Sequence, residues 1–568
     1  MPSAQPRTAA DAFLLSLNQA GIDYFFANPG TDFAPIIEGY SFGAQQGWKL
    51  PTPLPITHET VAMGMAYGYT LATGRTQAVM LHTNVGLANG IMGLLNASSD
   101  RVPMLMVSGR TPLTETGRDG RRDAGIHWGQ EMFDQAGMIR EAVKWDYDAR
   151  FGDQIPGLID RALAIAESAP EGPVCLSLPR EILGEAWPEG AALAKRRLAK
   201  ASPTRPAASA IEEAADWLAK AKRPLILAQR AGATPGAWDA LVGLADQFAL
   251  PVGEHWTIRP GFPNRHPMHA GFAPSATLAK ADVVLVLDSM VPWIPAHTEL
   301  ARGCKVIQMG ADPLHSKLPV RGYPSDLTLT GDIALTLADL ALALSDRIAP
   351  NSAAVVSRRE KLEKAHAKDR AAVMKIASDG SGEAMHPFYA TKCINEAFGP
   401  EATYVSELAM NPAVVDIQRQ GQYISHAMSG GLGWGIPAGL GVQLAKPGET
   451  VVASVGDGSH LFANPAACHQ VAESLELPLL MCVFNNGIWN AVRRAALNMY
   501  PDGDASKANI MPLTSLRPMP DFAAIAKASR AHGEQVLSGQ DLPAALDRAK
   551  AAMKSGQPAL LDIAVRLP

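Results

Sequence analysis

One stretch of the chain, residues 451–490, constrains the fold more than any other. It opens with the β-branched run Val451–Val455 and turns at Gly456-Asp457-Gly458-Ser459. A helix-like segment follows, then a second apolar run, Leu479–Phe484, which closes on Asn485-Asn486-Gly487. A strand, a glycine turn, a helix and a second strand form one βαβ unit. The stretch therefore predicts two neighbouring parallel strands.

The ends of these two strands carry oxygen ligands for a hard cation. Parallel strands present their carboxyl ends at one edge of the sheet, so Asp457 and Asn486 are expected to lie close together. Mg²⁺ takes a few protein oxygens and completes its shell with water and phosphate oxygens. Gly456 and Gly458 let the backbone approach a phosphate, and the helix N-terminus that follows favours an anion. We predict a metal-bridged diphosphate; an ordinary Rossmann-like turn is the alternative.

This pattern resembles the thiamine-diphosphate enzymes, whose cofactor motif joins Gly-Asp-Gly to a downstream Asn-Asn pair. The resemblance implies that Asp457 and the side chain of Asn486 hold Mg²⁺. The backbone carbonyl of Ile488 would be the third protein ligand. The diphosphate would lie against Gly456, Gly458 and Ser459.

A second match lies in residues 54–75, LPITHETVAMGMAYGYTLATGR, where small residues allow a helix to pack closely. Glu59 stands at the start of that helix, where a carboxylate ordinarily has a capping role. In thiamine-diphosphate enzymes a glutamate in this context bonds N1′ of the aminopyrimidine and promotes loss of the C2 proton of the thiazolium. A raised pKa would suit that role. Glu59 is therefore the first catalytic candidate, and His58 before it is expected to be structural.

A glycine-rich segment, SHAMSGGLGWGIPAGLGVQLAK, supplies a third match. Its glycines permit a close approach of backbone to a flat ring. In the resembling enzymes a bulky apolar residue here holds the cofactor in a bent shape. Leu432 occupies the matching position, with Gly431 before it; an isolated leucine would simply be core.

The length of 568 residues predicts about three domains. We expect them at residues 1–190, 205–350 and 380–568, with a Pro-, Ala- and basic-rich linker after the first. The resemblance implies three α/β domains with doubly wound parallel sheets: pyrimidine-binding, central and diphosphate-binding. FAD is not expected, because Asp288-Ser289-Met290 stands where FAD-binding relatives have Gly-x-Arg.

Composition narrows the function classes. A net charge of −5 gives no argument for nucleic acid or an anionic membrane surface, and no stretch approaches a membrane span. The five cysteines are scattered without a CxxC motif, which is typical of thiols in a reducing compartment. The N-terminus has an amphipathic pattern without a signal-peptide cleavage site. We therefore expect a cytoplasmic enzyme.

Three residues of the first two domains are candidates for substrate contact or proton transfer. Thr31 lies in the strand-end turn Asn28–Asp32, and His82 ends the strand before a glycine-containing turn. The His82 region resembles benzoylformate decarboxylase, where a histidine in a similar place handles protons. His297 is a further candidate, because decarboxylase relatives bring a histidine from the central domain into the site. Satisfied core or surface histidines are the alternatives.

Other candidates are basic or aromatic. Arg110 stands where related enzymes often have glutamine, and it is a candidate cation for a substrate carboxylate, or else a surface arginine. The segment that starts at Gln130-Glu131 resembles acetolactate synthases. Trp489 and Arg493 follow the asparagine pair and are candidates for shaping the pocket.

The sequence thus predicts a thiamine-diphosphate- and Mg²⁺-dependent enzyme that cleaves the C–C bond of a 2-oxo acid, in which the cofactor supplies the carbanion chemistry. His82 favours a decarboxylase, and the Gln130 segment favours an acetolactate-synthase-like carboligase. A catalytically idle cofactor-binding paralogue is the alternative of another class. Because Glu59 and Asp457 fall in different domains, the resemblance implies a homodimer or homotetramer with the active site at the subunit interface.

Overall fold

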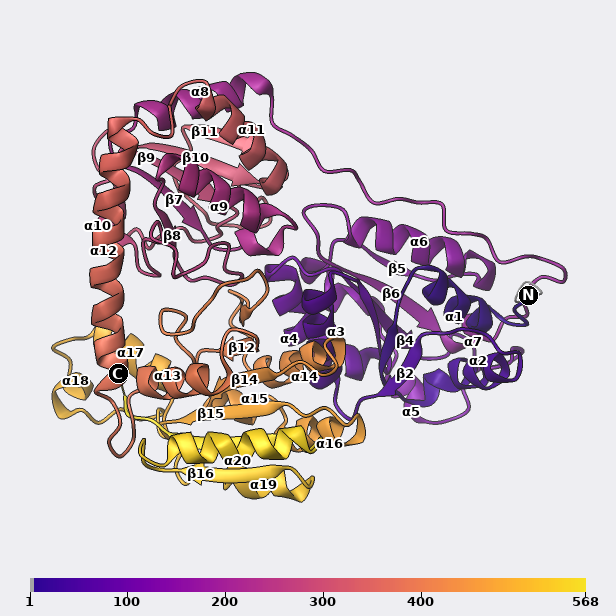
Figure 1. Cartoon of the computed structure of the whole chain (residues 1–568). Helices are drawn as coiled ribbons and strands as arrows, with labels where there is room; N and C mark the ends of the chain where they lie inside the picture. The colour runs from indigo at the N-terminus through magenta and orange to yellow at the C-terminus, as the bar shows by residue number, and fades with distance from the viewer. Residues whose placement is uncertain (1–4, 568) are drawn as a thin grey trace.

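The computed structural model describes residues 5–567. Residues 1–4 and 568, at the outer ends of the first and third predicted domains, lie outside the described part. The chain forms three α/β bodies in sequence order, drawn in indigo to purple, magenta to pink, and orange to yellow in Figure 1. Each body is built on one parallel sheet, which confirms the predicted fold class.

The N-terminal sheet has the strand order β2-β1-β3-β4-β6-β5. One face packs on helices α1, α2 and α6, and the other packs on α3 and α4, so the sheet is doubly wound. The strands are β1 (Tyr24–Asn28), β2 (Thr52–Pro55), β3 (Gln77–Leu81), β4 (Met104–Arg110), β5 (Asp146–Asp148) and β6 (Pro173–Pro179); the helices are α1 (Ala9–Gln19), α2 (Ala34–Gln45), α3 (Glu59–Thr73), α4 (Thr83–Ser99) and α6 (Ile155–Ala166).

The central sheet has five parallel strands in the order β11-β10-β9-β7-β8. Its core is formed with three helices, α8, α9 and α11. The elements are β7 (Pro224–Ala228), β8 (Val252–Glu254), β9 (Val283–Leu287), β10 (Lys305–Gly310), β11 (Leu327–Thr330), α8 (Ala208–Lys220), α9 (Ala237–Phe248) and α11 (Ile333–Ser345).

The C-terminal sheet has the order β13-β12-β14-β15-β17-β16 and contains the predicted βαβ unit. Strands β14 and β15 pair in parallel with Gly456 opposite Phe484, so the two motif-bearing strand ends are adjacent. The elements are β12 (Thr403–Glu407), β13 (Tyr423–Ser425), β14 (Val451–Gly456), β15 (Leu480–Asn485), β16 (His532–Val536), β17 (Ala559–Ala564), α13 (Pro387–Phe398), α14 (Gly435–Ala445), α15 (Asp457–Phe462), α16 (Pro465–Ser474), α17 (Asn490–Met499), α19 (Phe522–Ala528) and α20 (Leu542–Lys554).

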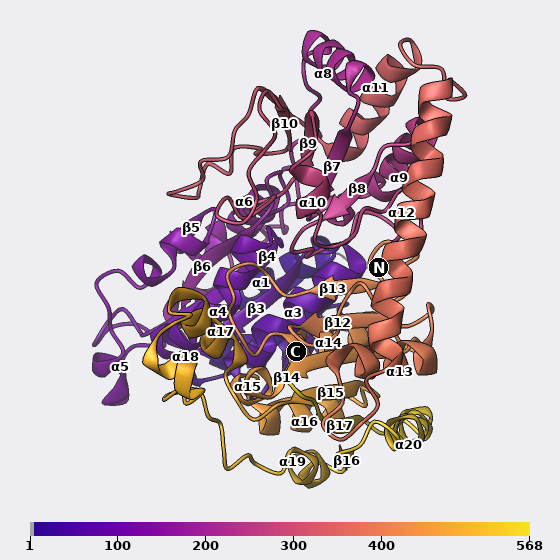
Figure 2. The same ribbon diagram turned by 90° about the vertical axis from the view of Figure 1, so that its left-hand side faces the viewer.

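Two long connections join the bodies. The first runs in an extended conformation from the N-terminal body to α8, and the second is the 26-residue helix α12 (Ala353–Ser378), which reaches from the central body to the C-terminal body (Figure 1 and Figure 2). Among residues 5–567, no helix is long and apolar enough to cross a membrane.

Glycines on α3 and α14 bring the N-terminal and C-terminal bodies into direct backbone contact. A Cβ at Gly68 would lie 2.0 Å from the carbonyl oxygen of Ala438, and one at Gly441 would lie 2.0 Å from that of Met65. At Gly64 it would lie 2.4 Å from the Cβ of Pro437. The small residues that predicted close packing of α3 therefore face α14.

A buried polar cluster joins all three bodies. Asp100, at the end of α4, binds Arg230 and Arg259 of the central body, with 3.1 Å between the Arg230 Nε and Asp100 Oδ1 atoms. Arg230 also contacts Asp288, and Arg259 donates to the carbonyl of Ser425 at 2.9 Å. Because each buried charge has a partner, the cluster fixes the relative positions of the domains without leaving an isolated ion.

Candidate active site

Asp457 links the two halves of the motif in the C-terminal body. It is 4 % exposed and begins α15 directly after β14. Its Oδ1 atom accepts the N–H of Gly458 at 2.8 Å, and its Oδ2 atom accepts the N–H groups of Asn486 (3.0 Å) and Gly487 (2.6 Å). Burial raises the pKa of Asp457, and these backbone hydrogen bonds oppose the rise. The carboxylate therefore organises the asparagine turn.

The turn after β15 is held by its own side chains. The Asn485 side chain donates to Asp562 at 3.0 Å and accepts the N–H of Gly487 at 3.1 Å. The Oδ1 atom of Asn486 accepts the N–H of Ile488 at 3.1 Å. Gly487 has a φ of 72°, which favours glycine. Both asparagines are half-buried, and the side chain of Asn485 bridges the turn to Asp562 of β17.

The indole ring of Trp489 lies close to the backbone of Gly458. A Cβ there would lie 2.0 Å from the indole ring of Trp489, which also packs edge-on against Phe462 with ring centroids 5.7 Å apart. The close approach at Gly458 is thus made by a side chain. Gly456 has only the Ser459 hydroxyl near its Cβ direction, at 4.0 Å. Trp489 therefore lies against the turn that is predicted to hold the diphosphate.

Glu407, at the end of β12, is a site residue that sequence reasoning missed. It is fully buried and accepts the N–H groups of Gly433 at 2.7 Å and Gly435 at 2.6 Å. Burial raises its pKa to about 7, while hydrogen bonds from these glycines and from the Ser459 side chain lower it. The carboxylate connects the loop of Leu432 to Ser459. A lone glutamate at a strand end gave no signal of this.

Asn96 of α4 is a second residue that was missed. It is 1 % exposed, and its side chain accepts the N–H of Gly431 at 3.2 Å and donates to the carbonyl of the same residue at 2.9 Å. The Ser429 hydroxyl donates to it at 2.5 Å. A helix of the N-terminal body therefore fixes the loop that precedes Leu432.

Glu59 begins α3, and its side chain is 13 % exposed. Its Oε1 atom would lie 3.5 Å from a Cβ at Gly86, so the carboxylate faces the first turns of α4. Within residues 5–567, no hydrogen bond to this carboxylate is present, and His58 lies 3.8 Å away. His58 instead caps α3 by accepting the N–H of Thr60 at 3.2 Å, in its expected structural role.

His82 lies at the end of β3 and precedes α4, close to the turn of Thr31. A Cβ at Gly30 would lie 2.2 Å from the His82 ring, whereas Thr31 itself is exposed. The Nδ1 atom of His82 lies 2.6 Å from Oδ1 of Asp32. This hydrogen bond raises the pKa of His82 despite partial burial, and the charge of Glu59 adds to the rise. Glu59, His82 and the Thr31 turn thus share one end of the N-terminal sheet.

Gln130 approaches the other side of the His82 ring. Its Nε2 atom lies 3.5 Å from Nε2 of His82, and its Oε1 atom is buried without a hydrogen-bond partner among the described residues. A buried amide oxygen without a partner is costly. Gln130 is therefore placed to bind a ligand next to His82.

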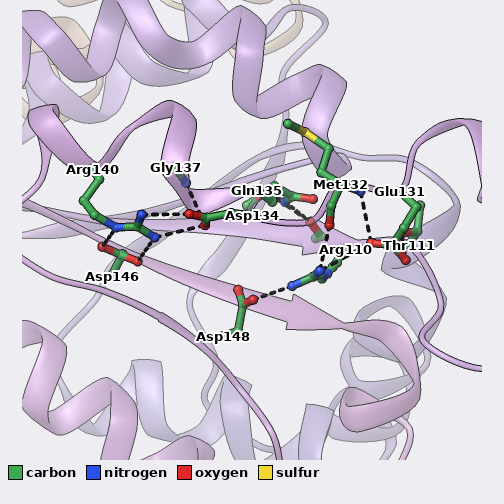
Figure 3. Close-up of polar contacts among 12 residues, drawn as sticks. Arg110, Thr111, Glu131, Met132, Asp134, Gln135, Gly137, Arg140, Asp146 and Asp148 are labelled. Atoms are coloured by element: carbon green, nitrogen blue, oxygen red, sulfur yellow. Dashed lines mark hydrogen bonds and ion pairs between the residues drawn. The ribbon is translucent and has the colours of Figure 1, made fainter.

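Arg110 is neutralised by the protein itself (Figure 3). Its guanidinium pairs with Asp148, lies 3.3 Å from a carboxylate oxygen of Glu131, and donates to the carbonyl of Met132 at 3.0 Å. Two carboxylates compensate its single charge, which disfavours Arg110 as the ligand of a substrate carboxylate. Arg110 ends β4, and its partners come from residues that follow later in the chain.

Two further candidates belong to the central and C-terminal bodies. His297 is exposed on a loop of the central body and interacts electrostatically with His255, whose pKa is lowered by burial and by His297. Arg493 lies on α17 and donates to Asn509 at 2.8 Å. The described contacts do not bring either residue together with the N-terminal candidates.

The donor set of the Asp457 turn suits a hard cation. It offers one carboxylate, one amide oxygen and one backbone carbonyl, the oxygen types that Mg²⁺ prefers. Across the described chain, no group of three His, Cys, Asp or Glu side chains is arranged for a metal ion. A cation at the turn would therefore complete its shell with oxygens from elsewhere, as a bound diphosphate would supply.

The chain thus combines three α/β domains with candidate cofactor and metal residues at the carboxyl ends of parallel strands. Three family profiles match: the thiamine pyrophosphate enzyme N-terminal TPP binding domain (residues 7–138), central domain (211–340) and C-terminal TPP binding domain (406–563). The chain belongs to the thiamine pyrophosphate enzymes, as the sequence motifs predicted.

Relatives that match over most of their length support the same family. The chain is 26 % identical to benzoylformate decarboxylase of Pseudomonas aeruginosa, with 98 % of both chains covered. It is 25 % identical to acetolactate synthase of Mycobacterium bovis, covering 96 % of this chain and 86 % of the relative. The fold matches the 4-hydroxybenzoylformate decarboxylase structure of Rhodococcus jostii with a TM-score of 0.77 at 24 % identity, covering 99 % of each chain.

Proposed function

We propose that the chain is a thiamine-diphosphate- and Mg²⁺-dependent decarboxylase of a 2-oxo acid. The observation that carries this choice is the hydrogen bond of His82 to Asp32 at the same end of the N-terminal sheet as Glu59, which raises the pKa of His82. A decarboxylase needs a proton donor beside the carbon that loses CO₂. The full-length similarity to a benzoylformate decarboxylase supports the same choice.

Each motif residue has a role in this proposal. Asp457, Asn486 and the carbonyl of Ile488 hold Mg²⁺, and the turn that includes Gly456, Gly458 and Ser459 holds the diphosphate. The bound cofactor supplies a carbon nucleophile and an electron sink. Glu59, whose carboxylate is free of protein hydrogen bonds in the described chain, binds the pyrimidine nitrogen and holds a proton there. Leu432, with Gly431, supports the bent cofactor.

The substrate side is formed by other residues. His82 exchanges a proton with the reacting carbon through Nε2, and Thr31 and Gln130 line the same end of the N-terminal sheet. Trp489 shapes the opposite wall, because its ring already lies against the Asp457 turn. His297, on a loop of the central body, and Arg493, on α17, are further proposed contacts of the substrate. Arg110 serves the structure through its ion pairs.

The proposal includes a homodimer or a dimer of dimers. Gly86 of α4 faces Glu59, whereas Asn96 of the same helix binds the Leu432 loop. Ten helical residues span about 15 Å. Glu59 and Leu432 of one chain thus lie near different ends of α4, which supports a cofactor ring held between two copies of the chain.

Subunit complementation tests this assembly. The variants Glu59→Gln and Asp457→Asn are each expected to be inactive, but hybrids made by co-expression contain one site with both wild-type residues. Recovery of activity in the hybrid supports a shared site, and no recovery despite verified hybrid formation contradicts it. A Glu38→Gln chain, altered at an exposed position on α2 of the same body, serves as the co-expression control.

A panel of 2-oxo acids tests the reaction. Pyruvate, benzoylformate and longer aliphatic acids are incubated with thiamine diphosphate and Mg²⁺ while CO₂, free aldehyde and 2-hydroxyketone are followed together. Aldehyde equal to CO₂, with loss of aldehyde in His82→Ala, is the expected result. Absence of CO₂ release from every acid, with the cofactor bound, contradicts the proposal and favours an idle cofactor-binding paralogue.

An acetolactate-synthase-like carboligase is the second candidate. The observation that favours it is Gln130, whose segment resembles that of the synthases and whose buried amide oxygen has no partner among the described residues. Hydroxyketone or acetohydroxy acid in place of aldehyde would establish this reaction. Gln130→Ala should then reduce the yield of hydroxyketone more than the release of CO₂.

A further inference from the structure

Asp32 is the most enclosed carboxylate near the proposed reaction centre. It is 2 % exposed within the turn η1 (Thr31–Phe33). Its Oδ1 atom lies 2.6 Å from Nδ1 of His82, and its Oδ2 atom accepts the backbone N–H of Thr83 at 3.3 Å. Because an ionised carboxylate only accepts hydrogen bonds, Nδ1 of His82 must carry the proton in this pair.

Backbone packing leaves this pair no alternative arrangement. A Cβ at Gly109 would lie 1.4 Å from Oδ2 of Asp32, and a Cβ at Gly30 would lie 2.2 Å from the His82 ring. Thr83 adopts a φ of 45°, an uncommon conformation for a β-branched residue, and its N–H points to Asp32. The Asp32–His82 pair is therefore enclosed by backbone on both sides.

The charges around the ring act in one direction. Asp32 from η1 and Glu59 from α3 both raise the pKa of His82, and partial burial opposes them. His127, on the short helix α5 (Ile126–Gly129), interacts electrostatically with His82, and its pKa is lowered chiefly by burial.

We propose that Asp32 is a positioning residue for His82: by accepting the hydrogen bond of Nδ1–H, it orients the imidazolium so that its Nε2–H group faces the substrate as proton donor, and the neutral Nδ1–H tautomer remains after the transfer. This inference rests on the proposed decarboxylase function. When the C–CO₂⁻ bond breaks, the electron pair that stays on carbon takes the Nε2 proton, and solvent returns a proton to His82. Prompt protonation favours release of aldehyde over addition to a second carbonyl.

The first experiment measures the pKa of His82 itself in the cofactor-free protein. Exchange of the imidazole C2 hydrogen with deuterium, followed by mass spectrometry across a pH series, reports each histidine separately. The variant Asp32→Asn should lower the pKa of His82 by at least about one unit, since a nearby opposite charge shifts a pKa by that amount or more. The matched control Asp134→Asn removes a carboxylate of the same body that pairs with Arg140 on the surface, and should leave His82 unchanged.

The wild-type protein gives a test that does not depend on folding of the variant. A His82 pKa at or below 6.5 in the wild type overturns the proposal, as does an unchanged pKa in a folded Asp32→Asn protein. His386, the capping residue of α13 in the C-terminal body, is the internal standard in every digest.

The second experiment separates this inference from the proposed function. In Asp32→Asn, the basic limb of the kcat profile should move to lower pH by the shift measured for His82, and the ratio of aldehyde to hydroxyketone should fall. A shifted His82 pKa without aldehyde release from any 2-oxo acid leaves the Asp32–His82 pair intact and refutes the decarboxylase. A shifted His82 pKa with an unchanged kcat profile overturns the role of Asp32 in proton donation.

Discussion

The contact between α3 and α14 makes Gly68→Ala the sharpest test of how this chain is assembled. The added Cβ would lie 2.0 Å from the Ala438 oxygen and 2.7 Å from its carbonyl carbon, whereas ordinary van der Waals contact begins at 3.4 Å. Both atoms belong to backbone, so no side chain can rotate away. The two helices have to separate by more than about 1 Å, because protein interiors are close-packed.

The size of the effect follows from two opposing terms. Overpacking a core costs about 1–3 kcal/mol, while replacing a helical glycine by alanine gains about 0.5–1 kcal/mol. Gly157→Ala on α6 of the same body is the matched control, because no heavy atom lies within 4 Å of its Cβ direction. The difference between the two variants isolates the overpacking. A difference of about 2 kcal/mol corresponds to about 4–8 °C in Tm for a domain of this size.

Thermal unfolding and titration with thiamine diphosphate provide the assay. Gly157→Ala should be at least as stable as the wild type, and Gly68→Ala should be the least stable of the three proteins. Since α3 begins at Glu59 and α14 follows the Leu432 loop, the Kd for the cofactor should rise only in Gly68→Ala. Equal Tm and Kd values in both variants would refute the packing argument.

Four further outcomes are expected. Glu59→Gln should lower kcat at least about 100-fold while calorimetry shows cofactor binding retained; an active variant removes Glu59 from catalysis. Asp457→Asn should raise the Kd for Mg²⁺ at least about tenfold, measured with the diphosphate present, and unchanged metal affinity contradicts its assignment. Glu407→Ala leaves two buried N–H groups unpaired and should lower the free energy of unfolding of the cofactor-free protein, measured in urea, by about 2–5 kcal/mol. Glu396→Ala on α13, at an exposed position, should leave that free energy unchanged. Burial lowers the pKa of His469 to about 4 from 6.5, so its contribution to stability is complete above pH 6.5 and is lost as pH falls toward 4; His469→Phe should flatten that slope.

The sequence determined the local architecture because its signals are short in range. The run Val451–Val455, the glycine turn and the asparagine pair define two parallel strand ends, and these are joined by hydrogen bonds that the N–H groups of Asn486 and Gly487 donate to Asp457. The three sheets agree with the predicted fold class, and Glu59 begins a helix after a short strand as expected.

The tertiary structure alone decided which isolated polar residues belong to the site. No local sequence motif marks three of these residues, yet each is buried and bonded to a segment outside its own element: Asp32, Asn96 and Glu407. Arg110 shows the opposite case, in which packing removes a candidate. Its predicted role required an unpaired positive charge, but its guanidinium forms ion pairs with Asp148 and Glu131.

The physical reason is the range of the interactions. Hydrophobic periodicity and turn residues act between residues that are close in the sequence, so their effects can be predicted from the sequence alone. The partners of a buried charge are chosen when sheets and helices pack, and a carboxylate finds its donors only after distant segments have come together. The chain thus determined by sequence where its cofactor motifs lie, and by packing which side chains orient them.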